Sequence, residues 1–507
     1  MPVGTSSAAV KFAVNLAAPL EPAHLELARR PLHVALPGHV RERVARCREF
    51  VLDISRSGRA IYGVTTGFGP LVEFEGRADG AGQSDNTIIH HIVGHGELMP
   101  PAVARAAVLA RLFSLAQGRS GVSEQVVAAL IAMLDTEFAP AVPRLGSVGA
   151  SGDLQPLAYV AHALRGNGKA FFQDELLPAG DALSRAGLGT LELDGRDALA
   201  LVNGISVTAA ALGLAVAQAT RSHSTAQLLA ALMADVLGCG TEFASVGLLA
   251  AFGHPDVADA GAAIRTWLEG STPSGERPLQ EPYSIRCTPQ LIGAAGTSVK
   301  HADDVVRRDL NGVSDNPLFF PETNEIAHGG NFFGQPSAFA ADQLNVALVQ
   351  LGNLAERQLD LLVDPHRNGG LPPMLSPAPG QHHALQGVQI SATATVAAMR
   401  RAAMPASVQS LPTNLHNQDV VPFGTQAAFT ALDQAGLLRY LHAGVAIALR
   451  QAVHVGARRP QAPRLAEVFD RIAAEVPPIT QDRPLDSTLG RVADLLDTVV
   501  SEVECVR

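Results

Sequence analysis

The chain has 507 residues, of which 47% are hydrophobic and 17% are charged, so it has ample apolar material for a large buried core. Its formal net charge of −10, with no Lys/Arg cluster, argues against nucleic acid or an anionic membrane as the main partner. The four cysteines lie far apart and form no C-x-x-C motif, which is typical of a reduced, cytoplasmic protein.

The N-terminal stretch MPVGTSSAAVKFAVNLAAPLEP lacks a continuous apolar run of signal-peptide length, in keeping with a cytoplasmic location. Residues 198–220 carry no charge and are long enough to cross a bilayer. Asn203, Thr208 and Gln218 are scattered through that run, however, and Gly204 interrupts it early. We therefore expect a buried core helix there rather than a membrane span.

Helical periodicity dominates the rest of the chain. Residues 102–117 and 123–135 are predicted to form two helices, the second starting near Ser123. Longer helices are predicted at 205–237, 337–363 and 424–453. The 337–363 segment has one apolar stripe with steps of three or four residues, formed by Leu344, Leu348, Leu351, Ala355, Leu359 and Leu362.

Strand patterns are few and short, and no β-α-β alternation runs along the chain. The sequence thus predicts a mainly α fold with a long antiparallel central helix bundle. We expect a loop-rich N-terminal domain at 1–205, followed at 206–507 by the long bundle and the C-terminal helices. Composition typical of loops marks 76–84, 269–282 and 364–381.

Nucleotide and metal motifs fail on inspection. GNGK at 166–169 has Ala163 where a phosphate-binding loop needs its first glycine, and GHG at 94–96 lacks the third glycine of a dinucleotide motif. His91 and His95 have the spacing of one helix face, but Gly94 disfavours a helix there and no carboxylate joins them. We predict no metal site and no external cofactor.

The stretch GSVGASGDL at 146–154 is the most informative. It does not match the hydrolase elbow G-x-S-x-G, because Asp153 occupies the fifth position. One interpretation is a loop that ends at a helix N-terminus, with Ser151 or Asp153 as its cap. The other is backbone chemistry, in which the unhindered nitrogen of Gly152 attacks the carbonyl carbon of Ala150. Loss of that water and of a second from Ser151 would leave a five-membered ring with an exocyclic methylene, which is an electrophile.

The stretch GSVGASGDLQPLAYVAHAL resembles the signature of the aromatic amino acid ammonia-lyase and aminomutase family, whose members form 4-methylidene-imidazol-5-one (MIO) from Ala-Ser-Gly. The resemblance extends from about residue 30 to 490, and its motifs come closest to those of bacterial tyrosine ammonia-lyases. The other motifs follow in family order: YGVTTGFGPL (62–71), ALVNGIS (200–206), EPYSIRCTPQLIGA (281–294), SDNP (314–317), HGGNFFGQP (328–336) and HNQDVV (416–421).

The resemblance implies a role for each motif. Ala150, Ser151 and Gly152 form the prosthetic group, Tyr62 is the base, and Tyr283 is a second catalytic tyrosine. Tyrosine ordinarily keeps its proton at neutral pH, so the site has to stabilise a phenolate. The substrate-binding residues implied are Arg286 for the carboxylate, together with Asn203, Asn331, Phe332 and Gln335. For Asn316 in SDNP, a structural turn and a pocket role stay equally open.

The resemblance also bears on assembly. The family forms homotetramers whose active sites draw residues from three subunits, so we expect Tyr62, Ser151 and Tyr283 to meet only after assembly. The Pro/Gly/Ser-rich run 269–282, just before Tyr283, fits a lid that closes over the substrate.

Substrate selection rests on a few positions. Gln418 stands where histidine lyases usually carry Glu, which argues against histidine. His90 and His91 align with the family's selectivity pair; His90 matches tyrosine lyases, and His91 matches histidine lyases. A buried imidazole at position 90 would bond a para-hydroxyl and reject a bare phenyl ring. His95, Gln155 and Pro422 depart from the residues common in relatives and leave the substrate open.

The sequence therefore predicts a carbon–nitrogen lyase that converts L-tyrosine to 4-coumarate and ammonia. A tyrosine or other aromatic 2,3-aminomutase is the close alternative, and a phenylalanine or histidine ammonia-lyase is less favoured. A non-catalytic helical scaffold is disfavoured, because Ala-Ser-Gly, Tyr62, Tyr283 and Arg286 are all intact.

Overall fold

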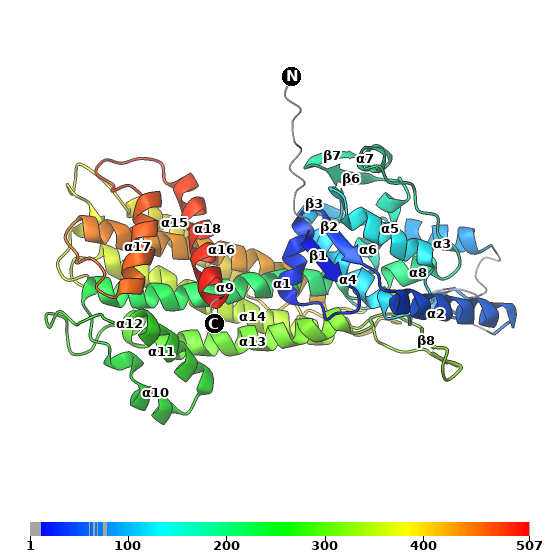
Figure 1. Ribbon diagram of the computed structural model, residues 1–507, viewed down its shortest axis with the longest axis horizontal. Coiled ribbons are helices and arrows are strands. Elements are labelled where there is room, and N and C mark those ends of the chain that lie inside the picture. The colour runs from blue at the N-terminus through cyan, green and yellow to red at the C-terminus, as the bar shows by residue number, and fades with distance from the viewer. Residues whose placement is uncertain (1–11, 60, 64–65, 68, 75–78, 506–507) are drawn as a thin grey trace, which may run out of the picture. The chain divides into compact units, whose positions relative to one another are not determined.

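The computed structural model describes residues 12–59, 61–63, 66–67, 69–74 and 79–505. Helices make up 59% of the chain and the strands are few and short, which confirms the predicted mainly α fold. The chain divides into two compact units (Figure 1). The first unit comprises 1–214, 303–341 and 405–429, and the second comprises 215–302, 342–404 and 430–507. This discontinuous division differs from the contiguous domains 1–205 and 206–507 that the sequence suggested.

The first unit holds the short strands and most of the short helices. Its helices are α1 (Pro22–Leu25), η1 (Glu26–Arg29), α2 (Gly38–Arg56), η2 (Gly69–Leu71), α3 (Gly80–Ile89), α4 (Pro101–Ala116), α5 (Glu124–Leu134), α6 (Leu154–Leu164), α7 (Ala179–Ala186) and α8 (Asp197–Val202). Its strands are β1 (Phe12–Asn15), β2 (Leu32–Ala35), β3 (His95–Leu98), β4 (Phe138–Pro140), β5 (Pro143–Leu145), β6 (Lys169–Phe172), β7 (Glu175–Pro178), β8 (Leu318–Phe320) and β9 (Glu325–Ala327).

The strands form small separate sheets rather than one large one. β1 pairs with β2 in parallel, whereas β3–β5, β4–β6–β7 and β8–β9 are antiparallel. Sheets of two or three short strands do not bury a core by themselves, so helices supply the hydrophobic packing.

Helix α4 is the centre of the first unit. Residues 103–116 are all buried, as expected of a helix without a polar face. Its Arg105 donates to the carbonyl oxygens of Ala28 (2.6 Å), Phe138 (2.6 Å) and Leu134 (2.8 Å), and so ties η1, β4 and α5 to one side chain. Burial lowers the pKa of Arg105 to about 10, and the guanidinium stays charged at neutral pH.

The second unit is almost entirely helical. It contains η3 (Glu242–Ala244), α10 (Val246–Phe252), α11 (Pro255–Trp267), α12 (Tyr283–Arg286), η4 (Pro373–Leu375), α15 (Gln386–Ala402), α17 (Pro463–Glu475) and α18 (Asp486–Cys505). The four longest helices, which contribute residues to both units, are α9 (Ser206–Leu237), α13 (Thr288–Asn311), α14 (Gln335–Val363) and α16 (Gly424–His454).

The predicted apolar stripe of α14 is buried, from Leu344 to Leu362. A Cβ added to Gly352 would lie 3.1 Å from Met399 Sδ on α15 and 3.2 Å from Leu441 Cδ1 on α16, so these three helices pack closely. α13 runs beside α14 (Figure 1), where Gln343 Nε2 donates to Ser298 Oγ at 3.4 Å. The long-helix core that periodicity predicted is therefore confirmed.

The structure bears on the predictions for two individual segments, 76–84 and 198–220. The loop predicted at 76–84 is wrong for 80–84, which form the first turn of α3, because the Asp79 carboxylate accepts from Gly82 N and caps the helix. Residues 76–78 lie outside the described residues. The run 198–220 is split at Asn203–Ile205 between α8 and α9, and no described helix is long and apolar enough to cross a membrane.

Candidate active site

A cavity of about 1090 Å³ in the first unit gathers most of the residues that the sequence singled out. Its volume is at the upper end of the range for small-molecule sites. Predicted residues that line it are Tyr62, His90, His91, Ala150, Ser151, Gly152, Asn203, Phe332 and Gln418. Asn331 and Gln335 are not among the lining residues, and Tyr283 and Arg286 belong to the second unit.

The Ala150-Ser151-Gly152 loop is anchored by the buried carboxylate of Asp153. Asp153 accepts from Thr208 N (2.8 Å), from Thr208 Oγ1 (3.0 Å) and from Thr425 Oγ1 (2.6 Å). Burial raises its pKa, and the hydroxyl and amide donors oppose that shift. Asp153 lies at the N-cap position of α6, but its side chain makes no bond to that helix. Its carboxylate instead binds the loop to the starts of α9 and α16.

Two glycines let this loop lie directly on the main chain of another segment. Gly152 has φ +72°, and a Cβ there would collide with the carbonyl group of Gly204 and lie 2.7 Å from its nitrogen. A Cβ on Gly204 (φ +148°) would in turn lie 2.7 Å from Ser314 Oγ. Asp153 N donates to Gly204 O at 2.7 Å, so the contact is hydrogen-bonded. No other residue type fits at either position without displacing the loop.

A buried ion cluster of Arg111, Arg196 and Asp315 lies next to Gly204. Arg196 Nη2 lies 2.6 Å from Asp315 Oδ1 with both side chains fully buried, and Arg111 Nη2 lies 3.7 Å from Asp315 Oδ2. Arg111 also donates to Ala200 O (2.9 Å) and to Ser314 O (2.7 Å). Two cations surround one anion in this core, and Arg196 Nη1 and Asp315 Oδ2 make no hydrogen bond within the described part of the chain.

Asn316 follows directly on this cluster and lines the cavity. Its backbone N–H donates to Asp315 Oδ1 (2.7 Å), and its Oδ1 accepts from Gly329 N (2.9 Å). Asn316 is therefore held as part of a turn and also faces the cavity, so the two interpretations left open by the sequence are compatible.

Two buried acceptors in the cavity wall have no partner among the described residues. They are Asn203 Oδ1, on a side chain only 2% exposed, and Gln155 Oε1. Ser151 Oγ, in contrast, accepts from Gln418 Nε2 at 2.7 Å. A buried acceptor without a donor is costly, so the wall is complementary to a ligand that carries N–H or O–H groups.

Tyr62 enters the cavity from the segment before α3. Its hydroxyl oxygen accepts from Gly69 N at 2.8 Å. Val64, Thr65 and Phe68 of the same motif lie outside the described residues.

The two histidines lie at the C-terminal end of α3. His90 is its exposed C-cap residue, and its Nδ1 contacts Asn86 O; His91 Nδ1 lies 2.8 Å from Thr87 O. A carbonyl oxygen can only accept, so this network assigns a proton to Nδ1 in both rings. Burial, followed by the nearby His90, lowers the pKa of His91 to about 4. His91 is therefore neutral at pH 7.

Tyr283 and Arg286 form α12 in the second unit. The Arg286 guanidinium lies over the Tyr283 ring at 4.7 Å, and Tyr283 is 70% exposed. Arg286 Nε is buried and has no hydrogen-bond partner within the described part of the chain. Both residues line a cavity of about 720 Å³ in that unit, to which Arg277, Arg367 and Arg458 also contribute.

Other cavity residues were not predicted as site residues. Gln155 differs from the residues common in relatives at its position. Its large side chain next to the Ala-Ser-Gly loop was the one sequence feature that could have indicated a place in the cavity. Asn414 and Leu415 gave no signal; they belong to a turn between Thr413 and Gln418 whose backbone is left-handed at 414–416. Of the other departures, His95 is exposed on β3, and Pro422 lies close to Gly149. No group of three or more His, Cys, Asp or Glu side chains that could hold a metal occurs among the described residues.

Comparison with known proteins agrees with this architecture. The model of the family described as "Aromatic amino acid lyase" matches residues 22–474. A histidine ammonia-lyase from Anaeromyxobacter dehalogenans is 39% identical over 478 residues, covering 91% of this chain and 94% of that protein. A tyrosine ammonia-lyase from Cereibacter sphaeroides is 38% identical over 467 residues, covering 87% and 88%. The solved tyrosine aminomutase from Streptomyces globisporus has a TM-score of 0.90 at 32% identity, over 97% of both chains.

The helical fold is thus that of ammonia-lyases and aminomutases. With the family model matching most of its length, the chain belongs to the aromatic amino acid lyase family. Because its relatives are ammonia-lyases, the protein is an enzyme of the carbon–nitrogen lyase class.

The half-buried His91 should make stability pH-dependent. Its folded-state pKa of about 4 lies below the ordinary 6.5, so the unfolded chain binds a proton there that the folded chain does not. Stability is therefore present above pH 6.5 and is lost as the pH falls from about 6.5 to 4. We expect His91→Gln to lose less Tm than the wild type between pH 7 and 5. The exposed His95→Gln is the control, and an unchanged slope in His91→Gln would contradict the assignment.

Proposed function

We propose that this enzyme eliminates ammonia from L-tyrosine to give 4-coumarate, at the cavity around Ala150-Ser151-Gly152. The observation that carries the proposal is the packing of Gly152 on Gly204, which presents an Ala-Ser-Gly segment to a cavity with unpartnered acceptors. An aromatic 2,3-aminomutase is the second candidate, supported by the likeness to a solved tyrosine aminomutase.

In this proposal Ala150, Ser151 and Gly152 form MIO and no external cofactor takes part. The residues fit the group: Gly152 has no Cβ to hinder its nitrogen, and Asp153 and Gly204 hold the loop from both sides. When formed, the group supplies an electrophile that makes the substrate amine a better leaving group. Gln418, which donates to Ser151 Oγ, and Asn203, with its unpartnered oxygen, are the residues that would hold the ring and the substrate amine.

The chain also has to remove a weakly acidic β-proton. We assign this step to Tyr62, whose oxygen takes the proton as phenolate. The Gly69 N–H donates to this oxygen at 2.8 Å and so helps to orient it.

We assign the substrate carboxylate to Arg286 and a second catalytic role to Tyr283. A guanidinium binds a carboxylate through two parallel N–H···O bonds, and no acidic side chain pairs with Arg286 among the described residues. In the assembled enzyme, a homotetramer, these groups meet Tyr62 and Ser151 from other subunits. Apolar side chains exposed on the first unit are candidates for such an interface; they include Val408, Leu411, Leu415 and Val420.

The selectivity assignment rests on the two histidines. The Nε2 of neutral His91 would accept a hydrogen bond from a phenolic O–H, and His90 lines the cavity beside it. A bare phenyl ring would leave the His91 acceptor unsatisfied, which disfavours phenylalanine. Histidine stays a candidate substrate for two reasons. Its own imidazole N–H could also donate a hydrogen bond to the cavity wall, and relatives of this chain are named histidine ammonia-lyases. The amide of Gln418, in place of a carboxylate, favours tyrosine.

We place the enzyme in the cytoplasm, because its cysteines form no disulfide motif.

Purified protein should be lighter than its translated formula by two water molecules, and should release ammonia from tyrosine with formation of 4-coumarate. Gly152→Ala should keep the full translated mass and lose activity, because its Cβ would displace the loop. Gly187→Ala is the control, since Gly187 has a similar φ of +70° but open space around it. Intact mass spectrometry and product chromatography measure both outcomes. A wild type with its full translated mass would refute formation of the MIO ring. Production of urocanate from histidine would overturn the assignment of tyrosine as substrate, and a β-amino acid product would indicate an aminomutase.

His90→Phe should shift preference from tyrosine toward phenylalanine by about tenfold to 100-fold in kcat/KM, because a polar side chain that lines the cavity is lost. The measurement is the kcat/KM ratio for the two substrates. The matched control is His95→Phe, whose position does not line the cavity. If His90→Phe keeps the wild-type ratio, His90 does not determine selectivity.

Specific activity should follow the fraction of tetramer on dilution, because each site needs residues from more than one subunit. Sedimentation and activity measured on the same dilution series test this. A monomer that turns over tyrosine at the full rate would refute the shared site.

A further inference from the structure

The segment just before α12 is tied down by one arginine. Arg277 Nε and Nη2 donate to the two carboxylate oxygens of Glu281 at 2.7 and 2.6 Å, and Arg277 Nη1 donates to the backbone oxygen of Arg367 at 3.0 Å. The Arg277 and Glu281 side chains are only 10% and 5% exposed. A bidentate pair so shielded from water fixes geometry, whereas exposed pairs contribute little.

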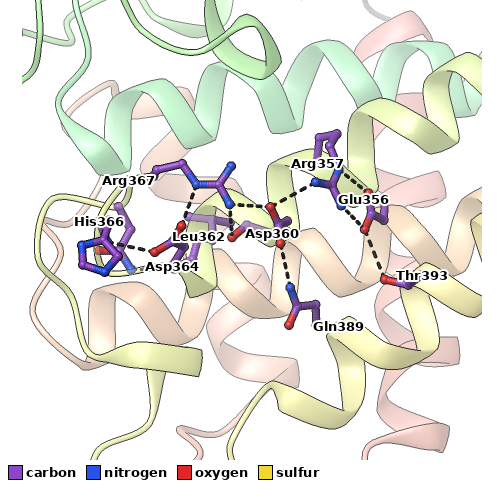
Figure 2. A network of polar contacts seen from close by, with 10 residues as sticks. Glu356, Arg357, Asp360, Leu362, Asp364, His366, Arg367, Gln389 and Thr393 are labelled. Atoms are coloured by element: carbon purple, nitrogen blue, oxygen red, sulfur yellow. Dashed lines mark hydrogen bonds and ion pairs between the residues drawn. The ribbon is translucent and has the colours of Figure 1, made fainter.

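The carbonyl group that Arg277 binds is itself held in place. Figure 2 shows the Arg367 side chain turned back onto the end of α14, where it contacts Asp360 and lies 2.8 Å from Asp364 Oδ2. Asp364 Oδ1 accepts from His366 N at 3.0 Å, and Gln389 Nε2 of α15 donates to Asp360 Oδ1 at 2.8 Å. The loop after α14 is thereby clamped on both sides of the Arg367 carbonyl group.

A second bond reaches α12 from the same helix. Gln358 of α14, only 3% exposed, donates through Nε2 to Ser284 O at 3.2 Å. Ser284 lies between Tyr283 and Arg286 on the one-turn helix α12. The helix is therefore fastened to α14 directly through Gln358 and indirectly through Arg277 and Arg367.

The anchoring changes the interpretation of the run 269–282. The sequence predicted a mobile lid there, and the run has no helix or strand. From Arg277 onward, however, the chain is bonded to α14 and its following loop. Cys239 lies beside the pair and interacts with both side chains, and burial raises its pKa to about 12, so it remains a neutral thiol.

We propose that Arg277 is a positioning residue: through Glu281 and the Arg367 carbonyl group it fixes the orientation in which α12 presents Tyr283 and Arg286. This inference rests on the proposed function, since it assumes that Tyr283 and Arg286 contact substrate. A guanidinium can bind both carboxylate oxygens and a carbonyl oxygen in one plane, whereas a lysine ammonium keeps only the positive charge. Lysine at this position should therefore restore only part of the effect. Misplacement of reacting groups by about 1 Å costs about 100-fold in rate.

The test uses the full-length enzyme with Arg277→Met and Arg277→Lys. We expect Arg277→Met to lower kcat/KM for tyrosine by about 100-fold with a raised KM, and Arg277→Lys to recover part of the loss. Intact mass should equal that of the wild type apart from the substitution, because the Ala150-Ser151-Gly152 loop lies in the first unit. Arg459→Met is the matched control; Arg459 pairs with Asp470 in the same unit, with both side chains 60% exposed, and its loss should leave kcat and KM unchanged.

A second readout does not depend on turnover. Amide hydrogen exchange at residues 283–287 should speed up in Arg277→Met and stay at the wild-type rate in Arg459→Met. If Arg277→Met does not fold, Glu281→Gln, which keeps the side-chain shape, takes its place.

The outcomes separate the two proposals. A wild type that releases no ammonia from tyrosine, phenylalanine or histidine refutes the proposed function. An active wild type whose Arg277→Met variant keeps its kcat, KM and exchange rates refutes the positioning role alone. A variant that loses activity together with the mass change of the loop also refutes positioning, because the defect then lies in the first unit.

Discussion

The contact between the main chains of Gly152 and Gly204 is the constraint on which the candidate site depends. With no Cβ on either residue, the Ala-Ser-Gly loop and the end of α8 approach as closely as two strands of a sheet, and Asp153 N bonds to Gly204 O. The buried cluster of Arg111, Arg196 and Asp315 supports one side of this contact, and the Asp153 carboxylate fixes the other. A loop held in this way cannot relax into an ordinary turn, which suits the backbone reaction proposed for this segment.

Charge and hydrogen-bond capacity are divided between the two units. The cavity of the first unit offers the unpartnered oxygens of Asn203 and Gln155 and the Nε2 of neutral His91 as acceptors. The cavity of the second unit is lined by arginines, and the guanidinium of Arg286 lacks an acidic partner among the described residues.

Much of the fold could be predicted from the sequence, because long helices leave a strong periodic signal. The stripe from Leu344 to Leu362 is buried as expected, and α5 starts after Ser123. Helix α3 was partly missed, since a single Asp79 cap outweighed a glycine-rich composition. The discontinuous units could not be predicted, because the helices that contribute to both have no break in their pattern. Most of the predicted residues that line the cavity came from motifs, whereas Asn414 and Leu415 line it because of a left-handed turn that no residue type indicated.

The anchoring of the Ala-Ser-Gly loop has a consequence for biosynthesis. Asp153 is held by Thr425, and Val148 O accepts from Phe423 N, so the loop acquires its shape only when a segment some 270 residues downstream has docked on it. A ribosome has to complete more than four-fifths of the polypeptide before that segment emerges. The loop therefore acquires these contacts only late in translation, and a truncated chain ending before Phe423 would lack the partners that shape it.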